Sequence, residues 1–234
     1  MNNKESQSFY LAIIGCDLYI DYFSSKDDNS NYQKKYLMPD TLDDNLNLSI
    51  LTKFILEKVK DFEKDVGNFV EKVNLITDAK YDLFSLSLKN KFNSNKIKDI
   101  DVVKLINDAK KLIIRNNKNC FILHILVDKY IVDGKEYFEL PENLYYNEFI
   151  IDLSFITVQN SIIETLNRVL KDCNIEVKKI ISHQYSNRFA NKRDTSPCIA
   201  GKKVIEGINS SEVITRNDYS KKRGLFEKML NFFG

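Results

Sequence analysis

The sequence has little of what disulfide-stapled, metal-binding or membrane-spanning proteins need. Its 234 residues include no Trp, 3 Pro and 4 Cys. No two cysteines form a CxxC pair, so the spacing of a zinc site is missing. No apolar run approaches the roughly 18 residues of a membrane span. The N-terminal residues lack the basic start and long apolar stretch of a secretory signal, so we expect a protein of the cytoplasmic side.

An excess of one charge sign is also missing. The chain has 35 Lys and Arg against 33 Asp and Glu, a net charge of +2. A dedicated nucleic-acid binder normally carries a strong basic excess, so nucleic acid is not an expected partner. The length suits one large domain or two small ones, and a chain of this size can bury a core without disulfide staples.

Hydrophobic periodicity predicts a mixed α/β protein in which helices cross between strands. Gly67 and Asn174 stand where left-handed residues end helices, and Asp133-Gly134 predicts a two-residue hairpin. Residues 24–48 and 184–222 are polar and are predicted to be irregular. The continuous apolar strand at 120–132 is expected to be covered on both faces. Helices are predicted over residues 50–66, 96–114 and 159–173, and strands over 9–23, 69–77, 81–88, 120–132, 149–158 and 175–182.

Residues 123–134, LHILVDKYIVDG, resemble the L-H-V-I-P-x-x-Y-x-[IL]-D-G run of bacterial FtsA, an actin-like cell-division protein. Pro141 stands in the loop that follows, residues 153–157 (LSFIT) are similar to the strand that ends H-x-I-T, and residues 173–177 (CNIEV) match the A-G-L-x-V helix exit. The match is best in the inserted subdomain of FtsA, called 1C or SHS2. The resemblance implies a partial actin-like fold of the α/β (α+β) class with a strand-helix-strand-strand subdomain.

The same resemblance implies a division of the chain into four parts. Residues 1–91 would be a remnant of subdomain 1A, and residues 92–186 the SHS2-like subdomain. Residues 187–220 would form an irregular linker, and residues 221–234 an amphipathic helix that targets a membrane. The family is longer, and most of its second lobe has no counterpart here.

The nucleotide loops of the family are altered. FtsA binds ATP through a D-I-G-[ST] loop, where this chain has Ile13-Ile14-Gly15-Cys16, with Ile13 in place of the carboxylate. The second loop would follow residue 183, where no glycine run occurs. A phosphate site needs clustered backbone N–H groups that glycine turns expose. We therefore expect no cofactor, no metal, no catalytic residue and no enzyme activity. Asp17 and Asp21 lie near the altered loop, but a lone carboxylate is weak evidence for magnesium.

The last residues predict a membrane-binding helix. At about 100° per residue the apolar side chains fall on one face, and the flanking cations suit an anionic lipid surface. A helix packed on the body of the protein is the alternative. The predicted membrane-binding residues are Lys221, Lys222, Arg223, Leu225, Phe226, Met229, Leu230, Phe232 and Phe233.

Few other residues stand out. His124 lies within an apolar strand and is expected to be a core histidine, and His183 is expected to have a surface role. Tyr145, Tyr146 and Phe149 form either an exposed partner-binding edge or part of the core; the pattern leaves both open.

The resemblance implies a non-enzymatic division protein, peripheral on the inner face of the cell membrane, that contacts other division proteins and can associate with its own copies. Contact with FtsZ is not expected, because that surface of FtsA lies in the second lobe. The alternatives are a residual ATP-binding actin-like protein and a pilus-assembly scaffold of the PilM type.

Overall fold

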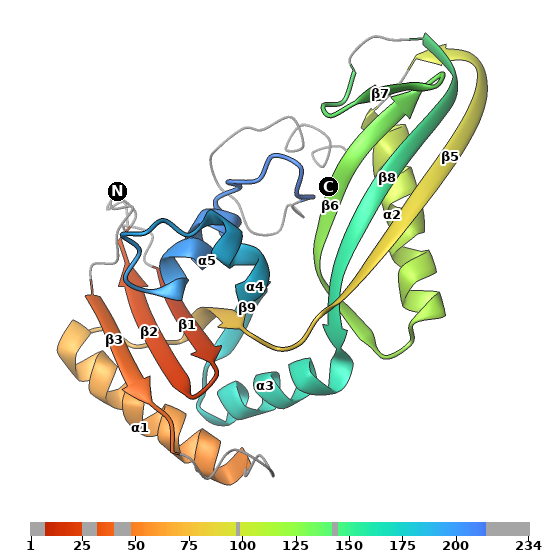
Figure 1. Ribbon diagram of the computed structural model, residues 1–234. Helices are drawn as coiled ribbons and strands as arrows, with labels where there is room; N and C mark the ends of the chain where they lie inside the picture. Colours follow the sequence, from red (N-terminus) through yellow and green to blue (C-terminus); the bar gives the residue numbers. More distant parts are fainter. Residues whose placement is uncertain (1–7, 25–31, 40–47, 97–98, 142–144, 214–234) are drawn as a thin grey trace, which may run out of the picture. The chain divides into compact units, whose positions relative to one another are not determined.

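The computed structural model describes residues 8–24, 32–39, 48–96, 99–141 and 145–213. These residues form a mixed α/β protein with two sheets (Figure 1). They fall into two compact units, which we describe separately. Unit 1 contains the described residues up to Lys80 together with Asn160–Ile208. Unit 2 contains Tyr81–Gln159 and the described residues from Asn209 onward.

Unit 1 is built on a five-stranded sheet of order β3-β2-β1-β4-β9. The strands β1 (Ser8–Ile14), β2 (Asp17–Phe23) and β3 (Tyr32–Leu37) form an antiparallel meander. The strands β4 (Lys72–Thr77) and β9 (Glu176–Ser182) continue the sheet in parallel with β1. Parallel neighbours need crossover connections, and such sheets are normally buried on both faces.

Helices cover both faces of this sheet. The helices α1 (Leu48–Val66) and α3 (Asn160–Asp172) contact each other on one side, where Phe62 of α1 meets the ring of Phe9. The helix α5 (Pro197–Ile205) contacts β1, β2 and β4 on the other side (Figure 1). It approaches so closely that a Cβ added at Gly201 would lie 2.7 Å from Cγ1 of Ile76. Between β9 and α5 the chain forms the short helices α4 (His183–Ser186) and η2 (Asn187–Phe189).

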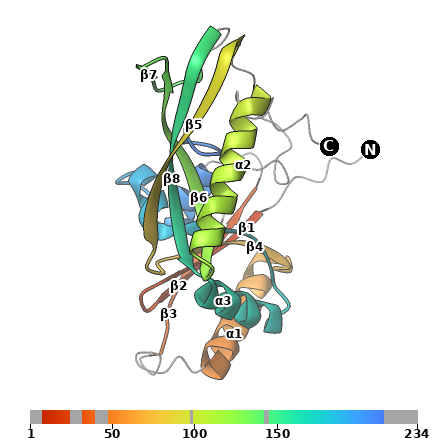
Figure 2. The same cartoon turned by 90° about the vertical axis from the view of Figure 1, so that its right-hand side faces the viewer.

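Unit 2 is an antiparallel sheet of order β5-β8-β6-β7 with one helix. Its elements follow in the order β5 (Asp82–Lys96), α2 (Asp99–Asn116), β6 (Cys120–Val132), β7 (Lys135–Tyr137) and β8 (Tyr145–Gln159). Figure 2 shows α2 lying along this sheet. The side chains that α2, β6 and β8 bury against one another are Val102, Val103, Ile106, Ala109, Ile113, Ile125, Val127, Tyr130, Val132, Tyr146, Phe149, Ile151, Leu153 and Phe155.

Most of the elements predicted from periodicity are present, with ends shifted by a few residues. The three long helices and the strand at 120–132 are confirmed. So are the special turn residues, because Gly67, Asp133, Gly134 and Asn174 all have positive φ angles. Asp133 does more than turn the chain, since its carboxylate accepts hydrogen bonds from the backbone amides of Asn147 and Glu148.

Four local predictions were wrong. The apolar run at 9–23 is two strands, because Gly15, at φ +53°, allows a tight turn within it. The polar stretch 24–48 contains β3, an edge strand without buried side chains. The strand β6 has a largely alternating burial pattern, so the prediction that both its faces are covered fails. The predicted linker at 187–220 contains α5, which starts at an N-cap serine, Ser196, followed by a proline.

The boundaries of the compact units also differ from the predicted ones. Unit 2 begins at Tyr81 and not at residue 92, because β5 pairs along its length with β8. It returns to unit 1 at Asn160 and not after residue 186, because β9 pairs with β4. The membrane-targeting helix predicted at 221–234 lies outside the described residues. Within the described part of the chain, no helix is long and apolar enough to cross a membrane.

Candidate functional site

The carboxyl ends of β1, β4 and β9 meet at one edge of the unit 1 sheet. Ligands of open α/β sheets bind at this edge, because the loops that leave parallel strands converge there. The residues that follow these strands are Gly15 after β1, Asp78 after β4 and His183 after β9. This edge includes the turn at Gly15, which the resemblance to FtsA places at the position of its first phosphate loop.

A carboxylate of the chain itself occupies the turn. The backbone N–H of Gly15 donates a hydrogen bond of 2.6 Å to Oδ2 of Asp78. The carbonyl of Cys16 accepts a bond from the N–H of Met38 at 2.7 Å. The amide that a phosphate oxygen would meet in a phosphate loop is therefore already bonded to a negative group. Asp78 could not be found from the sequence pattern, because 63 residues separate it from Gly15.

His183 completes this edge as a half-buried imidazole. Burial lowers the pKa of His183 below its ordinary value, because the protein interior disfavours the imidazolium, and the charge of Asp78 opposes the shift. The ring atom Nδ1 is buried without a hydrogen-bond partner within the described residues. The thiol of Cys16 is exposed and is not hydrogen-bonded to His183, so no nucleophile and base are paired here.

The two aspartates near the turn do not join Asp78. Asp17 forms a 2.8 Å ion pair with Lys35 on the neighbouring strand. Asp21 is fully buried beside the start of α5, facing Ser196 and Cys198. Neither carboxylate oxygen of Asp21 has a hydrogen-bond partner of good geometry within the described residues. Burial raises the pKa of Asp21 to about 7, and the two neighbouring side chains offset this rise only in part.

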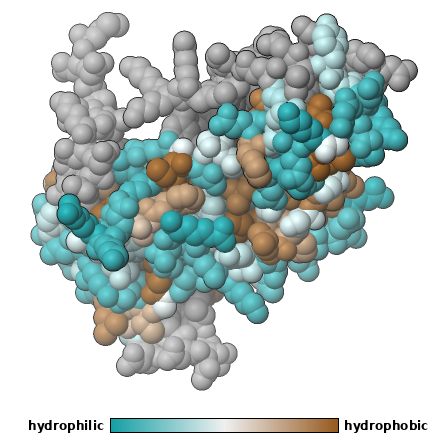
Figure 3. All heavy atoms as spheres, turned by 45° about the horizontal axis from the view of Figure 1, so that its top comes forward, coloured by the Kyte–Doolittle hydropathy of each residue, from teal (hydrophilic) through white to brown (hydrophobic). Residues whose placement is uncertain are grey.

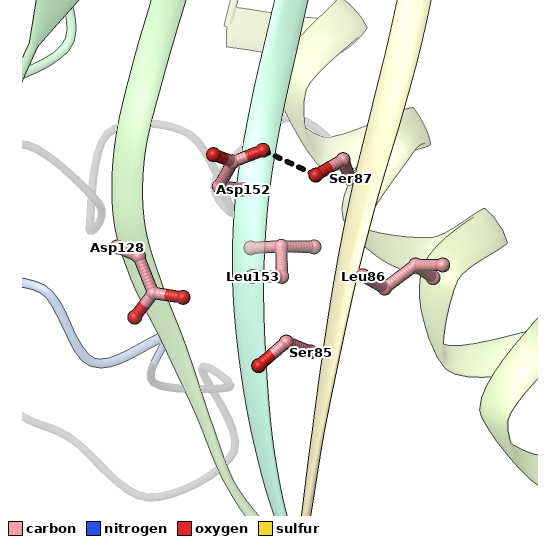
Figure 4. A pocket seen from close by; sticks show the side chains of 6 residues that line it. All are labelled: Ser85, Leu86, Ser87, Asp128, Asp152 and Leu153. Carbon is pink, nitrogen blue, oxygen red and sulfur yellow. Dashed lines mark hydrogen bonds between the residues drawn. The ribbon is translucent and has the colours of Figure 1, made fainter.

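A second polar site lies on the sheet of unit 2, where a hollow is lined by β5, β6 and β8 (Figure 4). The hydroxyl of Ser87 donates to Asp152 at 2.6 Å, and the hydroxyl of Ser154 donates to Asp128 at 2.7 Å. Within the described residues, no three His, Cys, Asp or Glu side chains are grouped to hold a metal ion. The hollow is therefore a hydrogen-bonded polar sheet face.

The structure separates the three aromatic residues of the predicted partner-binding edge. Tyr145 is 66% exposed, whereas Tyr146 and Phe149 are each 1% exposed and belong to the core of unit 2. An exposed edge made of all three residues is excluded, although Tyr145 still faces solvent, as does Phe138 after β7 at 77%. Over the described residues visible in Figure 3, the surface is mostly hydrophilic with scattered hydrophobic patches.

Comparison with known proteins gives no close relative. No family model matches the sequence, and no curated protein matches it. One similar solved structure is a PilM-PilN type IV pilus biogenesis complex, with a TM-score of 0.45 and 8% identity, covering 79% of this chain and 50% of that one. Another is the cytoplasmic domain of EpsL, an inner membrane component of the type II secretion system of Vibrio cholerae. It has a TM-score of 0.35 and 13% identity, covering 77% of this chain and 57% of that one.

The chain thus spans about half the length of either structure. Both TM-scores are below 0.5, so neither likeness supports a conclusion about this chain. These comparisons do not support a specific relation to FtsA, nor a role in cell division.

Proposed function

We propose that the protein is a non-enzymatic scaffold that binds other proteins of a membrane-associated assembly. The observation that carries the proposal is the hydrogen bond from Gly15 to Asp78 at the carboxyl edge of the unit 1 sheet. A phosphate placed there could not accept a hydrogen bond from this amide and would lie close to a carboxylate. Both residues are exposed at this turn, so water screens the repulsion between two negative groups there and weakens it without removing it.

The surroundings do not offset that repulsion. The imidazole at position 183 is disfavoured as a cation by its burial, so it supplies little positive charge near neutral pH. Asp17 is already paired with Lys35, and Asp21 is buried beside α5, so neither stands ready to hold a magnesium ion at the turn. These features favour a sheet that serves as a framework over one that binds nucleotide.

The identity of the assembly is a separate part of the proposal. A pilus-assembly scaffold of the PilM type is the first hypothesis, and a division protein similar to FtsA is the second. In either case we expect the segment 221–234 to hold the protein at the inner face of the cell membrane. The two hypotheses name different partners, so the partners distinguish them.

Two measurements test the proposal. The full chain, tagged and cross-linked in its native cells, should co-purify with other proteins of one assembly, and their identity decides between pilus and division. Isothermal titration with ATP and Mg²⁺ should show no saturable heat. Binding tighter than about 100 μM, which is within the range of working substrate affinities, would contradict the proposal and favour an ATP-binding actin-like protein.

A further inference from the structure

The carboxyl group of Asp21 is enclosed between the unit 1 sheet and the start of α5. None of this residue is exposed, and its side chain faces Ser196 and Cys198. Among the described residues, neither of its oxygens has a hydrogen-bond partner of good geometry. Buried polar groups in native proteins are nearly always hydrogen-bonded, and burial without partners costs more for a carboxylate than for the neutral acid. Ionisation of Asp21 therefore disfavours the arrangement that encloses it.

The cations of the surrounding elements are engaged with other carboxylates. Lys35 on β3 pairs with Asp17 at 2.8 Å, and Lys202 on α5 pairs with Glu206 at the same distance. Lys203 on α5 pairs with Asp194 at 2.6 Å. None of these ion pairs includes Asp21, so the described residues supply it with no paired cation. The other titratable side chains on the elements packed on this face are Tyr10, directly opposite Asp21 on β1, Tyr19 on β2 and Cys198 on α5, while β3 places the neutral Gln33 opposite.

Water can reach the carboxyl only if one of the walls around it moves. The strand β2 is paired with β1 on one side and with β3 on the other, so the sheet is the firmer wall. The opposite wall is the start of α5, where the hydroxyl of Ser196 accepts from the N–H of Cys198 at 3.1 Å. Before it, Thr195 exchanges two exposed hydrogen bonds with the side chain of Gln33. Each such bond adds only about 1 kcal/mol, and local opening of a weakly held element costs less than global unfolding.

We propose that α5 is a lid on the unit 1 sheet and that ionisation of Asp21 opens it. While the carboxyl is protonated the lid stays closed, with Gly201 packed closely against Ile76. Once the proton is lost, the carboxylate is hydrated only when residues 195–198 lift from β2, so the open form gains population as the pH rises. Opening also exposes the thiol of Cys198, which is fully buried in the closed form. This device goes beyond the proposed scaffold function and does not depend on it.

The pH range of the opening follows from the two ionisation states. Burial raises the pKa of Asp21 from 3.8 to about 7 in the closed form. The closed form thus holds the proton more tightly than the open form, where the carboxyl is hydrated. Its advantage is complete below pH 3.8 and is lost as the pH rises to about 7. Between pH 5 and pH 8 the open fraction should rise by about tenfold or more.

Hydrogen exchange of the full chain, followed by mass spectrometry and corrected for intrinsic rates, tests the lid. A detached helix of nine residues is marginal in water, so opening should release the amides of α5. Their protection should fall by about tenfold or more between pH 5 and pH 8. The central strand β4 is the reference and should stay about tenfold better protected than α5 at pH 8. Equal protection of α5 and β4 would mean that α5 opens only when unit 1 unfolds, and would overturn the inference.

Two variants assign the effect to one carboxyl. Asp21→Asn keeps the shape without the charge, so the protection of α5 should change by less than about threefold over the same pH range. Asp17→Asn, on the same strand but paired at the surface, is the matched control and should retain the wild-type profile. Circular dichroism checks that both variants are folded. A wild-type profile that does not fall, or a folded Asp21→Asn chain that keeps the fall, overturns the lid.

A second measurement needs no substitution. Iodoacetamide labelling of Cys198 in the wild-type chain is compared with labelling of the same residue in urea at the same pH, which removes the pH dependence of the thiol itself. The relative rate should rise by about tenfold or more between pH 5 and pH 8. A relative rate independent of pH overturns the lid, even if Asp21→Asn does not fold.

Discussion

Replacing Asp21 with Asn should change how the stability of the protein depends on pH. In the folded chain burial raises the pKa of this carboxyl from its ordinary value of 3.8 to about 7. The folded state therefore binds this proton more tightly than the unfolded state does. Between these two values the free energy of unfolding falls as pH rises, because ionising the buried carboxyl costs more than ionising it in water.

The size of the effect follows from the two pKa values. Each factor of ten in proton affinity is worth about 1.4 kcal/mol, so the full cost of ionisation is about 4 kcal/mol. It is absent well below pH 3.8 and complete above about pH 7. Between pH 5 and pH 8 this one group should remove about 2 to 3 kcal/mol of stability. Asn has nearly the same shape and no charge, so Asp21→Asn should not show that loss.

Urea unfolding followed by circular dichroism at pH 5 and pH 8 measures both proteins. The amide of Asn carries a constant cost of its own in a site without good partners, about 1 to 3 kcal/mol. The informative quantity is therefore the change in the stability difference between the two pH values. Asp17→Asn, on the same strand but paired with Lys35 at the surface, is the matched control and should retain the wild-type pH dependence. Equal losses for Asp21→Asn and the wild type would refute this account of the buried carboxyl.

Three further results are expected. Deleting residues 221–234, or changing Phe226 to Glu, should sharply reduce co-sedimentation with anionic liposomes; a deleted chain that pellets as well as the intact one would mean that the segment does not bind membrane. Gly201→Ala should lower the free energy of unfolding by about 1 to 2 kcal/mol, because overpacking against Ile76 outweighs the better helix propensity of Ala; an unchanged urea midpoint would show that Ile76 moves aside. In Asp78→Ala, phosphate or ATP binding should become detectable by calorimetry, because the carboxylate that blocks the turn is gone. The matched change Asp82→Ala should leave binding undetectable. Undetected binding to Asp78→Ala would mean that this carboxylate is not what blocks the turn.

Elements that bury one face could be predicted from the sequence. The helices α1, α2 and α3 place apolar residues at helical spacing, and Asp133, Gly134 and Asn174 mark turns through their own backbone preferences. The edge strand β3 could not be found in this way, because it buries none of its side chains and its strand form depends on pairing with β2. The helix α5 did carry a signal, since Ser196 caps it and a proline follows, but its flanks are polar.

The candidate sites were less predictable, because their contacts join distant parts of the chain. The altered turn at Gly15 was visible in the sequence, but the carboxylate of Asp78 that fills it comes from another strand. His124 was predicted to be a core histidine, and its burial confirms this, yet nothing local indicated Glu212 as its partner, 88 residues away. The role of the last residues stays a prediction, since they lie outside the described part of the chain.

The pairing of β5 with β8 has a consequence for how such a protein changes over time. Asp82, near the start of unit 2, is paired directly with Thr157, near its return to unit 1. A segment whose first and last residues lie side by side can be exchanged as a unit during evolution, because a short loop can replace it without disturbing the strands on either side. A lineage could thus replace unit 2 and keep unit 1. The segment 211–213, whose backbone is hydrogen-bonded to β6, would have to be exchanged with it, because a replacement without a matching strand would leave that segment with no edge to occupy.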